Sequence, residues 1–142
     1  MEDRQTIVVT GGGSGIGRAV VRRLCKDGAH VTAVGRRQQV LDILTTELST
    51  VDVVSADVAS EAGARAVATR LAEAGRGCAG VVAAAGGVSP GGDASLAGIR
   101  AGWEAGFESN VLTAVLAVEA LRSFCCHQWR RFAAPSVAPT AP

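Results

Sequence analysis

The chain has 142 residues, 48% of them hydrophobic, and its formal net charge is +1. This length is enough for one domain with a buried core, and the near-neutral charge gives no indication of a nucleic-acid partner. The longest apolar stretch, residues 111–118, is far shorter than the roughly 20 residues that cross a bilayer, so no membrane partner is expected.

The cysteines and the N-terminal residues indicate a reducing compartment. Four cysteines, at positions 25, 78, 125 and 126, show neither CxxC spacing nor nearby paired histidines, so neither a metal site nor a disulfide framework is expected. The first residues show no pattern of a secretory signal. We therefore predict a soluble cytoplasmic protein.

Strand and helix signals alternate along most of the chain. Strands are expected at residues 5–10, 30–34, 51–55 and 78–83, with the last one central because it is apolar on both faces. Helices are expected after the first glycine cluster, through residues 41–48, up to about residue 75, and from about residue 100 to residue 124. Such a β-α alternation predicts an α/β fold, with a parallel sheet between two layers of helices. On the first helix, the expected buried stripe consists of Ile16, Ala19, Val20 and Leu24, and Gly28 is expected to end the helix.

Glycines fill the connection between the first strand and the first helix. The segment reads Thr10-Gly11-Gly12-Gly13-Ser14-Gly15-Ile16-Gly17. A pyrophosphate needs backbone that approaches without Cβ atoms, and free N–H groups at a helix N-terminus. The strand before and the helix after the glycines therefore predict a dinucleotide-binding loop. Its expected contacts are Gly11, Gly13, Ser14, Gly15, Ile16 and Gly17.

The spacing TGxxxGIG resembles that of the short-chain dehydrogenase/reductase (SDR) family, whose members bind NAD(H) or NADP(H) on a Rossmann sheet. The resemblance covers residues 1–122 and implies a doubly wound sheet, truncated to about four strands in the order 3-2-1-4. Residues 123–142 do not follow the family pattern, and their proline-rich end predicts an irregular or disordered tail.

The end of the second strand indicates which dinucleotide is preferred. Members that prefer NAD usually carry an acid there, which holds the ribose 2′-hydroxyl and would repel a 2′-phosphate. This chain has Gly35 followed by Arg36 and Arg37. A guanidinium pairs well with phosphate, so NADP(H) is favoured over NAD(H). The alternative is that the two arginines merely solvate the start of the next helix.

Further site residues follow from the resemblance. Asp57 and Val58 match the pair that contacts adenine, although Asp57 could instead cap a helix, for which Ser60 is better placed. Ala84, Ala85 and Gly86 lie where the family has Asn-Ala-Gly, beside the nicotinamide ribose. Asn110 matches the asparagine of the catalytic tetrad, which bends its helix and holds a water; the alternative is a solvent-facing asparagine.

The resemblance implies hydride transfer between alcohols and carbonyls, which needs a proton donor beside the oxygen. In the family this is a tyrosine, assisted by a lysine and a serine, but this chain has no tyrosine and its one lysine is Lys26. Two interpretations stay open: an oxidoreductase product truncated or frame-shifted after about Arg122 and inactive alone, or a non-catalytic nucleotide-binding or scaffold protein. The exposed edge of the fourth strand and the last helix, with Val111, Leu112, Val115, Leu116, Val118 and Leu121, predict self-association.

Overall fold

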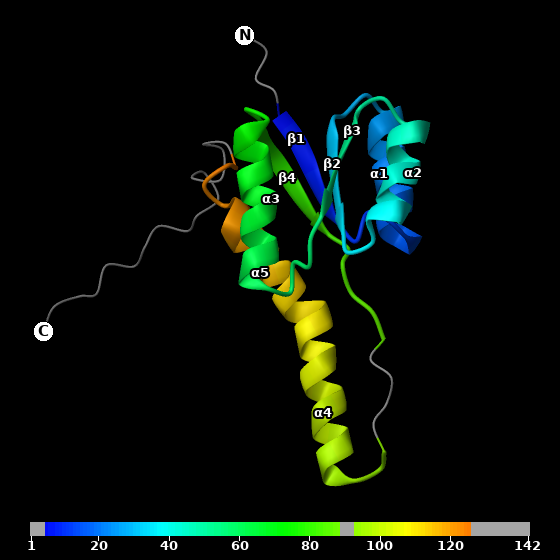
Figure 1. Ribbon diagram of the computed structural model, residues 1–142, viewed down its shortest axis with the longest axis vertical. Coiled ribbons are helices and arrows are strands. Elements are labelled where there is room, and N and C mark those ends of the chain that lie inside the picture. The colour runs from blue at the N-terminus through cyan, green and yellow to red at the C-terminus, as the bar shows by residue number, and fades with distance from the viewer. Residues whose placement is uncertain (1–4, 89–92, 126–142) are drawn as a thin grey trace, which may run out of the picture.

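The computed structural model describes residues 5–88 and 93–125, and they form a parallel sheet between two layers of helices (Figure 1). The strand order is β3-β2-β1-β4, and every pairing is parallel, which confirms the fold class and the strand order expected from the sequence. The elements are β1 Gln5–Thr10, α1 Gly15–Lys26, β2 Val31–Gly35, α2 Gln38–Glu47, β3 Val51–Ser55, α3 Glu61–Glu73, β4 Gly77–Ala83, α4 Leu96–Phe107, the π-helical turn η1 Glu108–Leu112, and α5 Thr113–Leu121.

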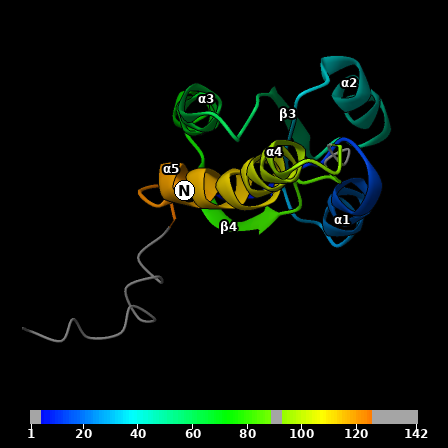
Figure 2. The same ribbon diagram turned by 90° about the horizontal axis from the view of Figure 1, so that it is seen from below.

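Each face of the sheet has its own core, because neighbouring strand residues point to opposite faces. One core packs α3 and α5 on the sheet, with Val8, Leu71 and Leu121 among its fully buried members. The other packs α1 and α2, around Val9 and Leu41. Figure 2 shows the same arrangement from below, with α1 and α2 on one side of the sheet and α3 and α5 on the other.

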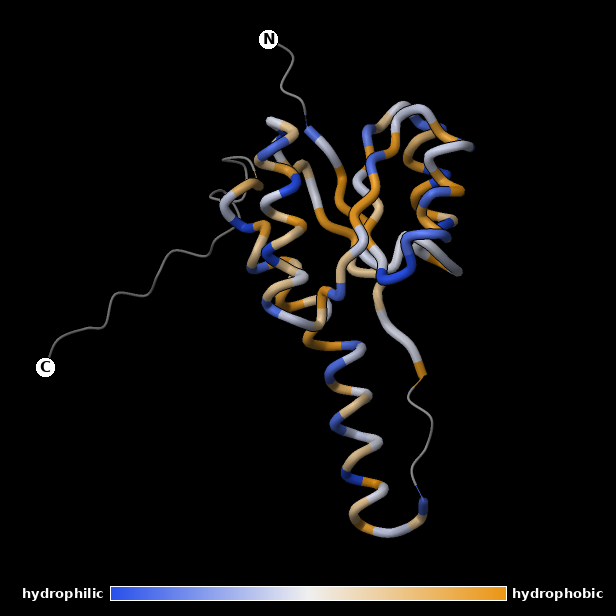
Figure 3. The backbone as a smooth tube through the Cα atoms, viewed as in Figure 1, coloured by the Kyte–Doolittle hydropathy of each residue, from blue (hydrophilic) through white to orange (hydrophobic). Residues whose placement is uncertain are grey.

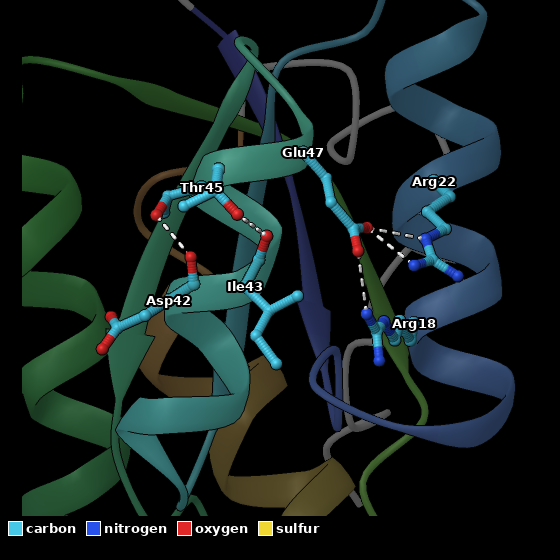
Figure 4. A network of polar contacts seen from close by, with 7 residues as sticks. Arg18, Arg22, Asp42, Ile43, Thr45 and Glu47 are labelled. Carbon is cyan, nitrogen blue, oxygen red and sulfur yellow. Dashed lines mark hydrogen bonds and ion pairs between the residues drawn. The ribbon is translucent and has the colours of Figure 1, made fainter.

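An ion-pair network joins α1 to α2 on the surface (Figure 4). Glu47, at the end of α2, accepts hydrogen bonds from Arg18 at 3.1 Å and from Arg22 at 2.7 Å. The pKa of the Glu47 carboxyl is lowered, mainly by its hydrogen bond from the Arg22 guanidinium. The network links the two helices at the surface, but exposed ion pairs of this kind add little stability.

The buried face of α1 differs from the stripe expected from the sequence. Val20 and Leu24 pack against the core as expected, and Gly17 and Val21 are buried. Ile16, however, is 80% exposed, and Ala19 also faces solvent. The helix is held at its first turn by a close approach to the glycine loop, and this contact sets which face lies on the sheet. The end of the helix is as expected, with Gly28 at φ +87° just after it.

Two more expectations about elements were wrong. β4 forms the edge of the sheet in the described residues, as the expected strand order 3-2-1-4 implies, so the expectation of a central strand from its apolar faces was wrong. The expected helix from 100 to 124 begins at Leu96, is interrupted by η1 and ends at Leu121. Its earlier start follows from Ser95, whose hydroxyl accepts a hydrogen bond from the Gly98 N–H and caps the helix.

The remaining expectations concern the tail and membranes. From residue 126 on, the expected irregular tail lies outside the described residues, as do residues 89–92 of the loop after β4. Within residues 5–88 and 93–125, no helix combines the length and the apolar character needed to cross a membrane.

Candidate functional site

The glycine loop holds two backbone segments closer together than any larger residue would allow. Gly11 has φ +68°, and a Cβ there would lie 2.5 Å from the carbonyl oxygen of Ala84. A Cβ on Gly17 would lie 2.7 Å from the carbonyl carbon of Gly11 and nearer still to its oxygen. Gly12, which the sequence interpretation did not single out, packs its backbone on the Ala33 side chain. The glycine loop is therefore packed between the backbone at the end of β4 on one side and the first turn of α1 on the other.

A cleft of about 670 Å³ opens at the carboxyl ends of the strands, beside this loop. In parallel α/β sheets, ligands bind at this end, where the strand order reverses on either side of β1. Of the residues expected to bind a cofactor, the cleft is lined by Gly11, Gly13, Ser14, Arg36, Arg37, Asp57, Val58, Ala85 and Gly86. Gly15, Ile16, Gly17, Ala84 and Asn110 are not part of its lining.

Arg36 and Arg37 differ from the other arginines of the described chain. Eight of the ten arginines in residues 5–88 and 93–125 lie within 4.0 Å of a carboxylate oxygen: 18, 22, 23, 65, 70, 76, 100 and 122. Arg36 and Arg37 are exposed at the cleft, and neither has a carboxylate partner in these ranges. They bring two positive charges to the side of the cleft formed by the end of β2 and the start of α2, whereas Asp57 and Glu108 are the acidic residues of its lining.

Asp57 lies in the turn between β3 and α3 and is one of the residues that line the cleft. Its Oδ1 accepts a hydrogen bond from the Ala59 N–H at 3.1 Å. The cap of α3 is Ser60, whose Oγ accepts from the Gly63 N–H at 3.0 Å, as the sequence indicated. Gly63 packs against the Asp57 backbone so closely that a Cβ there would lie 2.5 Å from its carbonyl carbon. Asp57 is thus held by its neighbours without capping the helix itself.

Two threonines hold the backbone of Ala85 in the cleft wall. Buried Thr10, at the end of β1, accepts a hydrogen bond from the Ala85 N–H at 3.2 Å. Buried Thr113, at the start of α5, has its hydroxyl 3.3 Å from the Ala85 carbonyl oxygen and 3.0 Å from that of Ser109. Sequence reasoning assigned no such role to either threonine, although a polar residue among apolar positions is a usable signal.

Asn110 lies in η1 and is directed at the loop after β4. Its Oδ1 accepts a hydrogen bond from the Gly87 N–H at 3.1 Å, and its Nδ2 donates to the Gly87 carbonyl at 2.9 Å. The same Nδ2 lies 2.9 Å from the carbonyl oxygen of Gly106 and 2.9 Å from Ser109 Oγ. The side chain is therefore used to bracket Gly87, even though the residue is exposed overall. This differs from the solvent-facing alternative considered for the sequence.

The cleft also includes residues that sequence reasoning missed. They come from the second strand and its helix, from the turn beyond Asp57, and from the loop and helix after β4: Val34, Gly35, Val40, Leu41, Ala56, Ala59, Gly87, Val88, Ala105, Glu108, Ser109 and Thr113. Four of these residues lie on α4, η1 and α5: Ala105, Glu108, Ser109 and Thr113. They reach the cleft because hydrogen bonds between Asn110 and Gly87 hold η1 beside the loop after β4. In the described residues, no group of histidine, cysteine and acidic side chains could hold a metal ion.

Comparison with known proteins shows the family. The family model described as short chain dehydrogenase matches residues 5–128, which is most of the chain. The protein belongs to the short-chain dehydrogenase family. An uncharacterized oxidoreductase of Staphylococcus epidermidis is 48% identical over 52 residues, covering 36% of this chain and 23% of that protein. The L-xylulose reductase of Mesocricetus auratus is 50% identical over 52 residues, covering 37% of this chain and 21% of that enzyme.

Solved structures extend this similarity over most of the short-chain dehydrogenase fold described here. RhlG of Pseudomonas aeruginosa, in a complex with NADP, is 28% identical with a TM-score of 0.76 over 87% of this chain and 51% of that one. The citronellol catabolism dehydrogenase AtuB of Pseudomonas aeruginosa PAO1 is 32% identical, with a TM-score of 0.74 and the same coverage. The chain thus spans about half the length of these relatives, and it shares their nucleotide-binding fold.

Proposed function

We propose that this short-chain dehydrogenase chain binds NADP(H) in the cleft, in preference to NAD(H). The observation that carries the proposal is the pair Arg36 and Arg37, which border the cleft without a carboxylate partner in the described residues. A related structure in complex with NADP supports a dinucleotide of this class. When bound, NADP(H) would supply the hydride of an oxidoreductase.

The residues present fit such a cofactor. The close packing at Gly11 and Gly17, which a single Cβ would prevent, fixes the glycine loop at the N-terminus of α1, where a pyrophosphate is stabilised. Arg36 and Arg37 would hold the 2′-phosphate. Asp57, at the far side of the same cleft, would hold the adenine.

The expected preference follows from the strength of charge-assisted hydrogen bonds. One such bond contributes about 1.5–3 kcal/mol, and about 1.4 kcal/mol corresponds to a tenfold change in affinity. The 2′-phosphate should therefore improve binding by roughly tenfold to a hundredfold. Competition with solvent at these exposed side chains favours the lower end of this range.

Titration calorimetry with 2′-phospho-ADP-ribose and with ADP-ribose tests the preference. We expect Arg36→Ala and Arg37→Ala to weaken binding of the phosphorylated ligand and to leave ADP-ribose almost unchanged. Arg65→Ala, which removes a surface arginine paired with Glu61 away from the cleft, is the control and should change neither affinity. Equal affinities of the unsubstituted chain for the two ligands would refute the preference.

We further propose that these 142 residues bind the cofactor without catalysing carbonyl reduction at a rate typical of the family. Hydride transfer needs a proton donor at the carbonyl oxygen. The chain has no tyrosine, Lys26 is the last residue of α1, and the Asn110 amide is bound to Gly87. A panel of ketones with NADPH should show only background oxidation of the cofactor. Turnover that disappears in Asn110→Ala, with a purified and verified sample, would contradict this.

Self-association through the last helices is the third part of the proposal. Large apolar side chains follow one another at helical spacing along α4, η1 and α5 and remain exposed: Leu96, Ile99, Trp103, Phe107, Val111, Val115 and Val118. α4 extends away from the sheet (Figure 3), and each of these side chains is at least 41% exposed. Leu121 is buried against the sheet and therefore does not belong to it. Contiguous exposed apolar side chains of this kind mark interaction surfaces.

Sedimentation velocity at micromolar concentration tests this part. We expect a dimer or larger species for the unsubstituted chain and a shift towards monomer for Trp103→Glu, because Trp103 is 78% exposed in the middle of the stripe. Ala101→Glu, on the same helix but on an exposed face away from the stripe, serves as a control for added negative charge. A stable monomer for the unsubstituted chain would refute this part alone.

A further inference from the structure

The fold brings two cysteines from distant parts of the sequence to adjacent positions. Cys78 is the second residue of β4, and Cys125 follows α5. The two form an isolated parallel bridge at the outer edge of the sheet, where the Cys78 N–H donates to the Phe124 carbonyl at 2.9 Å. Both thiols are free. The segment after α5 therefore lies beside the start of β4.

The surroundings of the pair are apolar. Cys78 is 1% exposed and belongs to the core that α3 and α5 cover, and Cys125 packs on the same core while partly open to solvent. Burial and, to a smaller extent, the neighbouring Cys125 thiol together raise the pKa of the Cys78 thiol to about 12.

The spacing of paired strands suits a covalent link. Neighbouring strands in a sheet lie about 4.7–4.9 Å apart. Disulfides join residues whose Cα atoms are about 4.4–6.8 Å apart.

We propose that Cys78 and Cys125 form an intramolecular disulfide when the protein meets a two-electron oxidant, such as a diazene or another disulfide. The Cys125 thiolate adds to the oxidant, and the Cys78 sulfur then displaces the reduced oxidant as the S–S bond forms. Two thiols lose two protons and two electrons, and the oxidant gains both. The bond closes residues 78–125 into a loop that contains the cleft wall from Ala85 to Thr113.

The other cysteines provide the internal comparison. Cys25 belongs to the core on the opposite face of the sheet, between α1 and β3, and it cannot meet Cys78 without unfolding. Cys126 is adjacent to Cys125 in the sequence but lies outside the described residues. A double variant, Cys25→Ser with Cys126→Ser, leaves only the proposed pair.

The experiment treats this double variant of the full chain with diamide under native conditions, blocks free thiols and maps the peptides by mass spectrometry. We expect a monomeric product in which the peptides of Cys78 and Cys125 are joined, and a melting temperature raised by at least about 5 °C, because the link restricts a long loop in the unfolded chain. A third substitution, Cys125→Ser, must abolish both effects.

Two further results would overturn the proposal. One is a Cys78 thiol that stays free under native diamide while Cys125 is oxidised or joined to a second molecule. The other is a crosslink in the double variant that forms in 8 M urea at least as fast as in the folded protein. In the four-cysteine chain, a native product that joins Cys78 to Cys126 rather than to Cys125 would also contradict the pairing.

Discussion

Gly17→Ala should destabilise the protein, although helix propensity alone predicts the opposite. Gly17 is the third residue of α1, where an alanine normally stabilises a helix by about 0.5–1 kcal/mol relative to glycine. In this fold, however, the new Cβ would lie 2.7 Å from the carbonyl carbon of Gly11 and also collide with its oxygen. These are backbone atoms, so no side-chain rotation can relieve the overlap.

The magnitude follows from the size of the required movement. A carbon at ordinary van der Waals separation lies about 3.5–4.0 Å from another carbon, so α1 and the loop must separate by about 1 Å. Overpacking of this kind costs about 1–3 kcal/mol, and a backbone collision belongs at the upper end. After the gain in propensity is subtracted, we expect a net loss of about 2 kcal/mol. For a chain of this size, that lowers the melting temperature by about 5 °C.

Thermal unfolding followed by circular dichroism measures the effect, with Gly13→Ala as the matched control. A Cβ on Gly13 would lie 3.4 Å from the side chains of Leu41 and Val40, which is near ordinary contact, so its melting temperature should change by less than about 2 °C. Gly17→Ala should also lose affinity for ADP-ribose, since it displaces Gly11 at the cleft. A melting temperature for Gly17→Ala equal to or above that of the unsubstituted chain would refute the reasoning.

Three other expectations concern groups outside the glycine loop. Burial and the charge of Arg76 lower the pKa of His30 below its usual value of 6.5. The contribution of His30 to the free energy of unfolding should therefore be fully present above about pH 6.5 and be lost as the pH falls through the lowered pKa. His30→Gln should flatten this dependence in denaturant titrations from about pH 7.5 to 5. Glu47→Gln should change the melting temperature by less than about 2 °C, because the partners of Glu47 are exposed arginines. A larger fall in melting temperature would mean that the ion pairs in Figure 4 hold α1 and α2 together. Asn110→Ala should lower the free energy of unfolding by about 1–2 kcal/mol, because the hydrogen bonds to Gly87 are lost. Asn110→Asp keeps an acceptor but loses the donors, so its stability should lie between that of Asn110→Ala and that of the unsubstituted chain. Equal stability of the two variants and the unsubstituted chain in chemical denaturation would contradict a stabilising role of these hydrogen bonds.

The fold was predictable because its signals are local. Short apolar runs separated by amphipathic segments indicate a parallel sheet with covering helices, and the observed strand order matches that expectation. The prediction failed where one contact between distant residues overrides a local pattern. Ile16 continues an apolar pattern but is exposed, because the approach of Gly17 to Gly11 sets the orientation of α1.

β4 shows a second limit of local patterns. Its apolar residues predicted a central strand, but it forms the sheet edge in the described residues. Within it, Cys78 alone is fully buried, and the segment at Cys125 lies beside it there. An apolar edge is thus covered at its start by chain that is more than forty residues distant in sequence, and no periodicity within the strand reports that contact.

One wall of the cleft could not have been derived from the sequence for the same reason. Ser109 and Glu108 line it because η1 is fastened to the loop after β4. The resemblance to a family identified Asn110 as a residue of interest, and the structure shows which atoms its amide holds. This wall of the cleft follows from the hydrogen bonds between Asn110 and Gly87, and no motif around Ser109 predicts it.

The two arginines at the cleft show how composition and geometry complement each other. The sequence has 14 basic and 13 acidic residues, so the charges alone would allow nearly every cation a partner. Most described arginines do find one, usually three or four residues away on the same helix or on the neighbouring helix. Arg36 and Arg37 lie at the end of β2 and the start of α2, where their nearest helical neighbours are Gln39, Val40 and Leu41 and carry no charge. Their lack of a counter-charge in the described residues is therefore local in origin, and a phosphate in the cleft would provide the charge that the sequence around them does not.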